Sequence, residues 1–159
     1  MASLIAFGLV IVIGDQLLKW YILNNLALGE VIPFIPGFVQ LTYFQNMGIA
    51  FGFLQNHHWV PMVVNPIIVI GLIVVLARGI FPGKIQRWAM VAVIAGAVGN
   101  LIDRFVHGFV IDMFQFTFVR FAIFNIADVF ITLGGIVWAA AYVIEGLQNQ
   151  KKASEPSHE

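Results

Sequence analysis

The chain contains no cysteine, which excludes disulfide bonds, a thiol nucleophile and cysteine-ligated metals. Only 10% of its 159 residues are charged and the formal net charge is zero, so we expect no large basic surface for nucleic acid. Serine occurs only at Ser3, Ser154 and Ser157, near the two ends, which argues against a serine nucleophile. No two of the four histidines have the spacing of metal ligands, so we expect neither a metal site nor a cofactor.

Hydrophobic residues, by contrast, make up 60% of the chain, which is well above the share in soluble domains. That much apolar surface needs lipid as its solvent. About 20 apolar residues cross the hydrocarbon core of a membrane. Four runs approach that length: 3–23, 59–78, 88–105 and 121–145. We therefore predict an all-α membrane protein of a single domain (1–159), with four transmembrane helices and a polar, disordered tail over 148–159.

The distribution of lysine and arginine predicts the orientation of these helices. The connection between the first two runs, 24–58, contains neither residue type. Basic residues instead flank the middle connection and follow the last run: Arg78, Lys84, Arg87, Lys151 and Lys152. Because basic loops stay in the cytoplasm, we predict that the middle connection and both termini are cytoplasmic. The two long connections then face the outer side of the membrane.

Both long connections have the sequence character of β-strands. In the first, Phe38 to Tyr43 alternates between two faces, after prolines and a glycine that punctuate its entry. Asn46-Met47-Gly48 is typical of a turn, and a second strand is predicted over 49–53. The second connection, 108–120, is also extended, with phenylalanines on one side. We therefore expect a small extracytoplasmic β-sheet whose aromatic residues lie at the lipid headgroups.

The polar residues inside the apolar runs lie at one depth. With a rise of about 1.5 Å per residue, each set lies within roughly 10–12 Å of the outer end of its helix. Each set includes a pair spaced three or four residues apart, so it projects from one helix face. The residues are Asp15, Gln16, Lys19, Asn100, Asp103, Arg104, Asn125 and Asp128. We predict that these faces converge inside the bundle, where intramembrane polar groups belong.

Asp112, in the second outer connection, and Asp128, in the last run, are the best candidates for catalysis. A carboxylate in a membrane segment costs free energy, so it indicates a functional site. Two carboxylates that share a site cannot both ionise easily, and the pair holds one proton. The ionised member can activate water while the protonated member polarises a carbonyl, as in aspartic proteases. The amides of Asn46, Asn100 and Asn125 can hold an extended peptide.

Other interpretations remain open at this level. Asp15 with Lys19, and Asp103 with Arg104, can be ion pairs that only hold the helices together. Carboxylates with a basic partner also occur in proton-coupled carriers, although four helices without a repeat are few for a carrier. A non-catalytic assembly factor would explain the outer sheet but not the clustered aspartates. The residues alone thus indicate a membrane enzyme or carrier that uses paired aspartates.

Five short motifs occur along the chain: Asp15-Gln16-Leu17-Leu18-Lys19, Asn46-Met47-Gly48-Ile49-Ala50-Phe51, Gly99-Asn100-Leu101-Ile102-Asp103-Arg104, Val110-Ile111-Asp112 and Phe124-Asn125-Ile126-Ala127-Asp128. With these motifs in this order, the chain resembles the bacterial lipoprotein signal peptidases (signal peptidase II) over nearly its whole length. Each motif alone is weak, but five in order on four predicted spans are specific.

The resemblance implies an aspartic endopeptidase of the bacterial cytoplasmic (inner) membrane, with its active site near the outer face. Its substrate would be a prolipoprotein with a diacylglyceryl group on its cysteine, and cleavage would fall just before that cysteine. The resemblance also implies sensitivity to the cyclic peptide globomycin. Membrane lipid is the other expected partner, and nothing demands more than a monomer. The implied roles are Asp112 and Asp128 as the catalytic pair, Asn46, Gly48, Asn100, Arg104 and Asn125 around substrate or inhibitor, and Asp15, Gln16, Lys19 and Asp103 as supporting residues.

Overall fold

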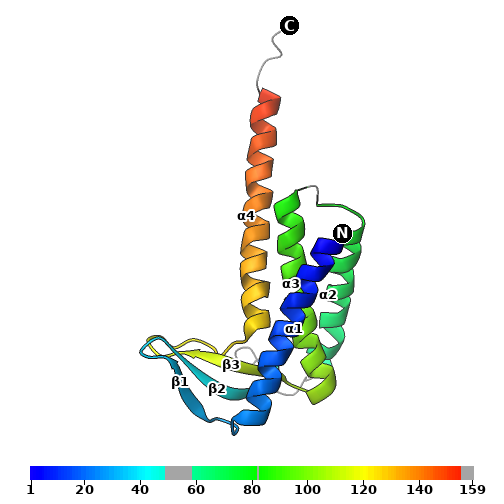
Figure 1. Cartoon of the computed structure of the whole chain (residues 1–159). Coiled ribbons are helices and arrows are strands. Elements are labelled where there is room, and N and C mark those ends of the chain that lie inside the picture. Colours follow the sequence, from blue (N-terminus) through cyan, green and yellow to red (C-terminus); the bar gives the residue numbers. More distant parts are fainter. Residues whose placement is uncertain (49–58, 82, 155–159) are drawn as a thin grey trace.

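The computed structural model describes residues 1–48, 59–81 and 83–154. Within these ranges the chain forms four helices, with a three-stranded sheet at one end of them (Figure 1). In chain order the elements are α1 (Ala2–Asn25), β1 (Val31–Ile35), β2 (Val39–Asn46), α2 (Trp59–Ala77), α3 (Lys84–His107), β3 (Val110–Phe116) and α4 (Ile126–Ser154). The prediction of a mostly helical chain with a small sheet is confirmed.

Helix α3 is the centre of the bundle, because it packs against α1, α2 and α4. Large apolar side chains cover the outside of the helices, as expected where lipid is the solvent; examples are Ile13, Leu17, Ile67, Ile70, Leu133 and Ile136. Three helical stretches in the described chain are long and apolar enough to cross a membrane: 2–25, 84–107 and 126–151. Helix α2 is apolar over the shorter stretch Pro61–Ala77, so three of the four expected spans meet both measures.

Glycines bring α3 and α4 into close contact. A Cβ atom on Gly134 of α4 would lie 2.8 Å from the carbonyl oxygen of Ala89 and 2.9 Å from a methyl group of Val93, both on α3. Gly96 of α3 faces the backbone of Ala127 in the same way. Small residues at helix interfaces let backbones approach closely in membranes. This contact fixes the first turn of α4 against α3.

The sheet is antiparallel, with β2 between β1 and β3. Strands β2 and β3 coincide with the two predicted extended segments. Strand β1 is not expected from the sequence, because Pro33 indicates a break. Proline is tolerated there because β1 is an edge strand, in which Pro33 lies opposite Gln40. The predicted strand over 49–53 lies outside the described residues.

A buried apolar cluster joins the sheet to the end of α1. Its members are Ile22, Leu26, Leu41, Tyr43, Ile111 and Met113. They come from α1 and the residue that follows it, β2 and β3, so the sheet cannot rotate freely against the helices. The sheet is therefore a fixed platform at one end of the bundle, and Asp112 lies on it.

The boundaries of α4 differ from the prediction. The sequence predicts a helix over 121–145, but α4 begins at Ile126 and continues to Ser154. Phe124 is instead held in an antiparallel bridge with Phe114 of β3, through backbone hydrogen bonds of 2.8 and 3.1 Å. The helix starts only beyond this bridge. The predicted disordered tail is helical as far as the described residues reach.

We predict that Gly134→Ala destabilises the protein by about 1–3 kcal/mol, because the added methyl group overpacks the interface with α3. The matched control is Gly135→Ala, whose Cβ would meet no atom within 4 Å. The control should retain its stability or gain up to about 1 kcal/mol, since alanine favours a helix. Chemical unfolding in detergent micelles measures both variants. Equal stability of the two would contradict the close α3–α4 contact.

Candidate active site

Asp112 lies in β3, where its side chain is completely buried. In the adjacent strand a register shift between Leu41 and Phe44 comes just before the pair of Phe44 with Asp112. Irregularities of this kind re-aim side chains and are common next to active sites. Two amides hold the carboxylate: Asn46 Nδ2 donates to Oδ2 at 2.8 Å, and Asn125 Nδ2 donates to Oδ1 at 2.7 Å.

Asp128 lies in the first turn of α4, as part of a capping box. Asn125 Oδ1 accepts a hydrogen bond from the backbone N–H of Asp128 at 2.9 Å, and Asp128 Oδ2 accepts one from the N–H of Asn125 at 3.2 Å. The first backbone N–H groups of a helix have no partner within the helix. In a capping box, two of them are each bound by the side chain of the other residue. The other carboxylate oxygen, Oδ1, accepts a hydrogen bond from Asn100 Nδ2 at 2.8 Å. Asp128 therefore has a fixed orientation.

Asn125 links the two aspartates, which the sequence predicts to lie in one site. Its fully buried side chain donates to Asp112 and accepts from the backbone of Asp128. The amide nitrogens of Asn46 and Asn125 donate to Asp112, and that of Asn100 donates to Asp128.

Burial raises the pKa of Asp112 to about 7, well above the ordinary value for aspartic acid. The negative charge of Asp128 also raises this pKa, whereas the hydrogen bonds from Asn46 and Asn125 and the charge of Lys19 lower it. Asp112 can therefore hold or release a proton near neutral pH. A carboxyl group with this property beside a second carboxylate is suited to acid–base chemistry.

Lys19 of α1 is the centre of a buried ion network behind the aspartates. Its ammonium group lies 2.8 Å from Asp15 Oδ2, 2.9 Å from Asp103 Oδ2 and 2.9 Å from Asn100 Oδ1. Lys19, Asp15 and Asp103 are each 1% exposed. An ammonium group has three donors, and all three are used here. The ion pair of Asp15 with Lys19 within α1, one of the interpretations of the sequence, is present. Asp103 of α3 forms a second ion pair with the same lysine.

The same network holds the backbone that carries the two aspartates. Asp15 Oδ1 accepts a hydrogen bond of 2.9 Å from the N–H of Ala127, in the first turn of α4. Asp103 Oδ2 accepts one of 3.0 Å from the N–H of Ile111, the residue before Asp112. Helix α1 and helix α3 thereby fix both β3 and α4. Sequence reasoning misses the contact of Asp15 with Ala127, because no local pattern connects residues so far apart in the chain.

Gln16 and Arg104 have different surroundings, although both are predicted site residues. Gln16 belongs to the ion network, since its Nε2 donates to Asp103 Oδ1 at 2.9 Å. Arg104 does not bind Asp103, because successive residues of a helix point about 100° apart. Its Nη1 donates instead to the carbonyl oxygen of Asn100 at 3.1 Å. The Asp103–Arg104 ion pair is thus not among the ion pairs of the described chain.

Gly48 shapes the turn that carries Asn46. Its φ of +85° is in the left-handed region, and its N–H donates to Asn46 Oδ1 at 2.9 Å. A Cβ atom at this position would lie 2.9 Å from Pro61 Cγ. Both the conformation and the space therefore require glycine, and the turn fixes the amide that holds Asp112.

Two cavities reach Asp128. One, of about 330 Å³, lies between α2, α3 and α4, and Asn100, Arg104 and Asp128 give it a polar edge. Asn65 of α2 lines it as well; the sequence indicates only a helix kink at this residue, because proline follows it. The other cavity, of about 290 Å³, is mostly apolar, and its remaining lining residues are Phe121, Phe124, Val129, Thr132 and Leu133. Asp128 therefore lines both a cavity with a polar edge and a mostly apolar one.

Comparison with known proteins shows the family of the chain. A family model described as signal peptidase (SPase) II matches residues 7–144. The lipoprotein signal peptidase of Streptococcus pneumoniae is 42% identical over 144 residues, which are 90% of this chain and 94% of that protein. The lipoprotein signal peptidase of Streptococcus pyogenes serotype M5 is 45% identical over 123 residues, which are 77% and 81% of the two chains.

Two solved structures share the fold. A structure described as a bacterial membrane enzyme has a TM-score of 0.83 and 28% sequence identity, and the match covers 100% of this chain and 95% of that one. A second structure with the same description has a TM-score of 0.82 and 30% identity, over 89% and 93% of the two chains. These relatives favour a peptidase and lend no support to a carrier. The chain belongs to the signal peptidase II family.

Proposed function

We propose that the chain is an aspartic endopeptidase of the bacterial cytoplasmic membrane. It removes the signal peptide from diacylglyceryl-modified prolipoproteins and cleaves just before the lipidated cysteine. The observation that carries this proposal is the link between Asp112 and Asp128 through the amide of Asn125. The membership of the signal peptidase II family supports it.

In the proposed mechanism the two aspartates share one proton. The ionised carboxylate takes a proton from water as the water oxygen attacks the carbonyl carbon before the cysteine. The protonated carboxyl group donates to the carbonyl oxygen, so a neutral tetrahedral intermediate forms without an isolated negative charge. The carboxyl group that took the proton from water then gives it to the leaving amide nitrogen as the C–N bond breaks. The other carboxylate takes a proton back from a hydroxyl group of the intermediate, so the pair again holds one proton. The raised pKa of Asp112 makes it the better proton donor at neutral pH.

The two cavities at Asp128 suit a substrate that is partly lipid. The polar edge formed by Asn100 and Arg104 offers hydrogen bonds to a peptide backbone, and the apolar cavity offers space for an apolar group. We assign Asn46, Gly48, Asn100, Arg104 and Asn125 to substrate binding, and expect a globomycin-type cyclic peptide to compete there.

The proposed topology has four spans, with α2 as the shortest. The basic residues around the α2–α3 connection support cytoplasmic termini and a sheet on the outer side. The pair of Asp112 and Asp128, called the dyad below, then lies near the outer surface. Water and a substrate held in the outer leaflet can both reach it there. A monomer contains every residue of this mechanism.

We predict that Asp112→Asn and Asp128→Asn each lower the cleavage rate by about 10²–10⁴-fold or more, because each removes one acid–base group. Cleavage of a diacylglyceryl-modified prolipoprotein by purified protein in detergent, followed by gel shift, measures the rate. Glu30→Gln, which neutralises an exposed acid outside the site, is the matched control. The unlipidated precursor should remain uncut. Wild-type rates in a folded Asp112→Asn or Asp128→Asn variant would disprove the dyad.

The rate should fall as pH rises above about 7, since Asp112 then loses its proton and the dyad carries two negative charges. The hydrogen bond from Asn46 favours the Asp112 anion, so Asn46→Ala should raise the pKa of Asp112 further. The alkaline limb of kcat/KM should therefore move to higher pH by about 0.5–1 unit.

A pH profile from about pH 5 to pH 9 tests this shift. Gln45→Ala is the control, because Gln45 lies beside Asn46 but donates to Tyr43 instead of an aspartate. The control should leave the limb in place. A limb that stays or moves to lower pH in Asn46→Ala would contradict the assignment of Asp112 as the proton donor.

We predict that Lys19→Met lowers stability by about 3–5 kcal/mol, because it leaves two carboxylates buried without their cation. The triple variant Lys19→Met, Asp15→Asn and Asp103→Asn removes all three charges and should recover most of that loss. Lys84→Met, at an exposed lysine, should change stability by less than about 0.5 kcal/mol. Unfolding in detergent distinguishes the variants. If the triple variant were no more stable than Lys19→Met, charge pairing would not be the reason why the network stabilises the fold.

A further inference from the structure

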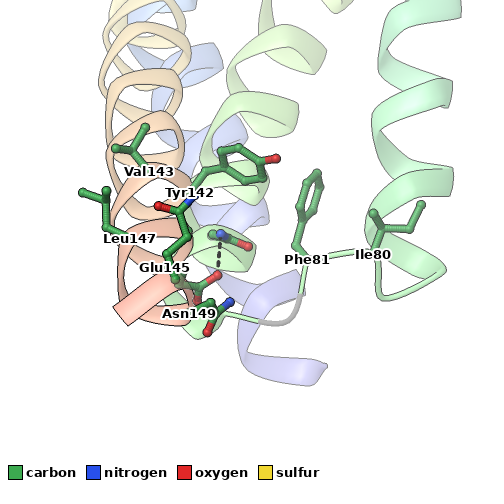
Figure 2. Close-up of a pocket in the computed structure, with 10 residues that line it drawn as sticks. Ile80, Phe81, Tyr142, Val143, Glu145, Leu147 and Asn149 are labelled. Atoms are coloured by element: carbon green, nitrogen blue, oxygen red, sulfur yellow. Dashed lines mark hydrogen bonds between the residues drawn. The ribbon is translucent and has the colours of Figure 1, made fainter. Parts of the chain in front are cut away.

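A second polar site lies at the opposite end of the bundle from the sheet. A cavity of about 470 Å³ is formed there between α4 and the connection from α2 to α3. Figure 2 shows the rings of Phe81 and Tyr142 projecting into the space between these segments, with Glu145 beside them on α4. Its volume is in the range of small-molecule sites. None of the residues that line it belongs to the proposed peptidase site.

The cavity contains an unpartnered acceptor. Gln86 lines it and is 2% exposed; its Nε2 donates to Glu145 Oε2 at 2.8 Å (dashed line in Figure 2). Gln86 Oε1 has no hydrogen-bond partner within the described chain. Buried polar atoms are nearly always hydrogen-bonded, so an orphan acceptor indicates a missing donor. The carboxylate of Glu145 next to it favours a donor with positive charge.

An unpartnered donor lies on α4, two turns before Glu145. Trp138 Nε1 is the other buried side-chain atom in the described chain that lacks a partner. Trp138, Tyr142 and Glu145 follow one another at spacings of four and three residues, so they lie on one face of the helix. The Trp138 ring stacks on Tyr142 at 5.8 Å and meets Phe81 edge-on at 5.5 Å. Trp138 does not line the cavity itself, but its ring contacts two rings that do, those of Phe81 and Tyr142.

We propose that this cavity binds a phospholipid of the inner leaflet whose headgroup carries a primary ammonium. The ammonium has three donors, which suit Gln86 Oε1 and the Glu145 carboxylate, and the aromatic rings attract its charge. The Trp138 N–H is left for a phosphate or ester oxygen of the same lipid. The apolar side chains of Ile80 and Leu147 complete the wall beside the acyl chains.

The order of these groups along α4 agrees with the order of groups in a lipid. In the proposed orientation α4 runs toward the cytoplasm, so Trp138 lies deeper in the membrane than Glu145. A phospholipid likewise has its ester oxygens deeper than its ammonium. Tryptophan and tyrosine are enriched at this level of membrane proteins. The inference uses the proposed orientation, but it is independent of the aspartate chemistry.

Native mass spectrometry of the purified full chain tests the proposal. The protein in detergent is titrated with phosphatidylethanolamine, phosphatidylcholine or phosphatidylglycerol of identical acyl chains. Wild type should retain phosphatidylethanolamine about tenfold better than the other two, because choline has no N–H donor and glycerol has no charge. Equal retention of the three lipids would overturn the proposal. Soluble phosphoethanolamine that competes fully would show a free amine as the ligand and overturn the lipid assignment.

Variants locate the binding site. Glu145→Gln and Gln86→Met each remove one partner of the ammonium with little change in volume, and each should weaken phosphatidylethanolamine retention about tenfold. Glu30→Gln, which removes a negative charge at the other end of the molecule, should leave retention unchanged. Prolipoprotein cleavage in detergent should stay at the wild-type rate in all three, which separates this site from the peptidase site. Wild-type lipid preference in a folded Glu145→Gln variant would overturn the proposal.

Discussion

The burial of one ammonium group between two carboxylates is the interaction on which the rest of the structure depends. In an apolar bundle an unpaired charge is strongly destabilising, so Lys19, Asp15 and Asp103 are tolerated only together. The carboxylate oxygens of the two acids also accept hydrogen bonds from the backbone of α4 and β3. Those two segments carry Asp128 and Asp112. The positions of Asp112 and Asp128 therefore depend on the ion pairs that Lys19 forms with Asp15 and Asp103.

The choice of amides at the site has a physical reason. An amide side chain holds a carboxylate without adding a charge, so Asp112 keeps the raised pKa that burial gives it. A cation in the position of Asn125 would favour the ionised form of both carboxyl groups and remove the proton that they share in the proposed mechanism. The cation of the network is kept at a distance, where Asn100 lies between Lys19 and Asp128. Asn46 and Asn125 thus orient Asp112, and their hydrogen bonds offset only part of the rise in pKa that burial causes.

The sequence predicts much of this site, because a polar residue in an apolar run is costly and therefore conspicuous. Depth and helical spacing alone bring Asp15, Lys19, Asn100 and Asp103 to one layer, as the structure has them. The sequence fails where a long-range contact overrides a local pattern. Pro33 lies within a strand because that strand is at the edge of the sheet. Helix α4 begins later than predicted because Phe124 forms a backbone bridge with Phe114. Neither the partner of Asp15 on α4 nor the cavity at Asn65 has a local signal.

The capping box at the start of α4 has a consequence for the newly made chain. Asn125 and Asp128 arrive with the last helix of the described chain, whereas Asp112 is already in the strand before it. Until α4 packs against α3, Asp112 has neither its second amide nor its partner carboxylate. A nascent chain that has inserted three helices therefore has no assembled dyad. In the proposed mechanism, proteolytic activity therefore begins only after the last helix has packed.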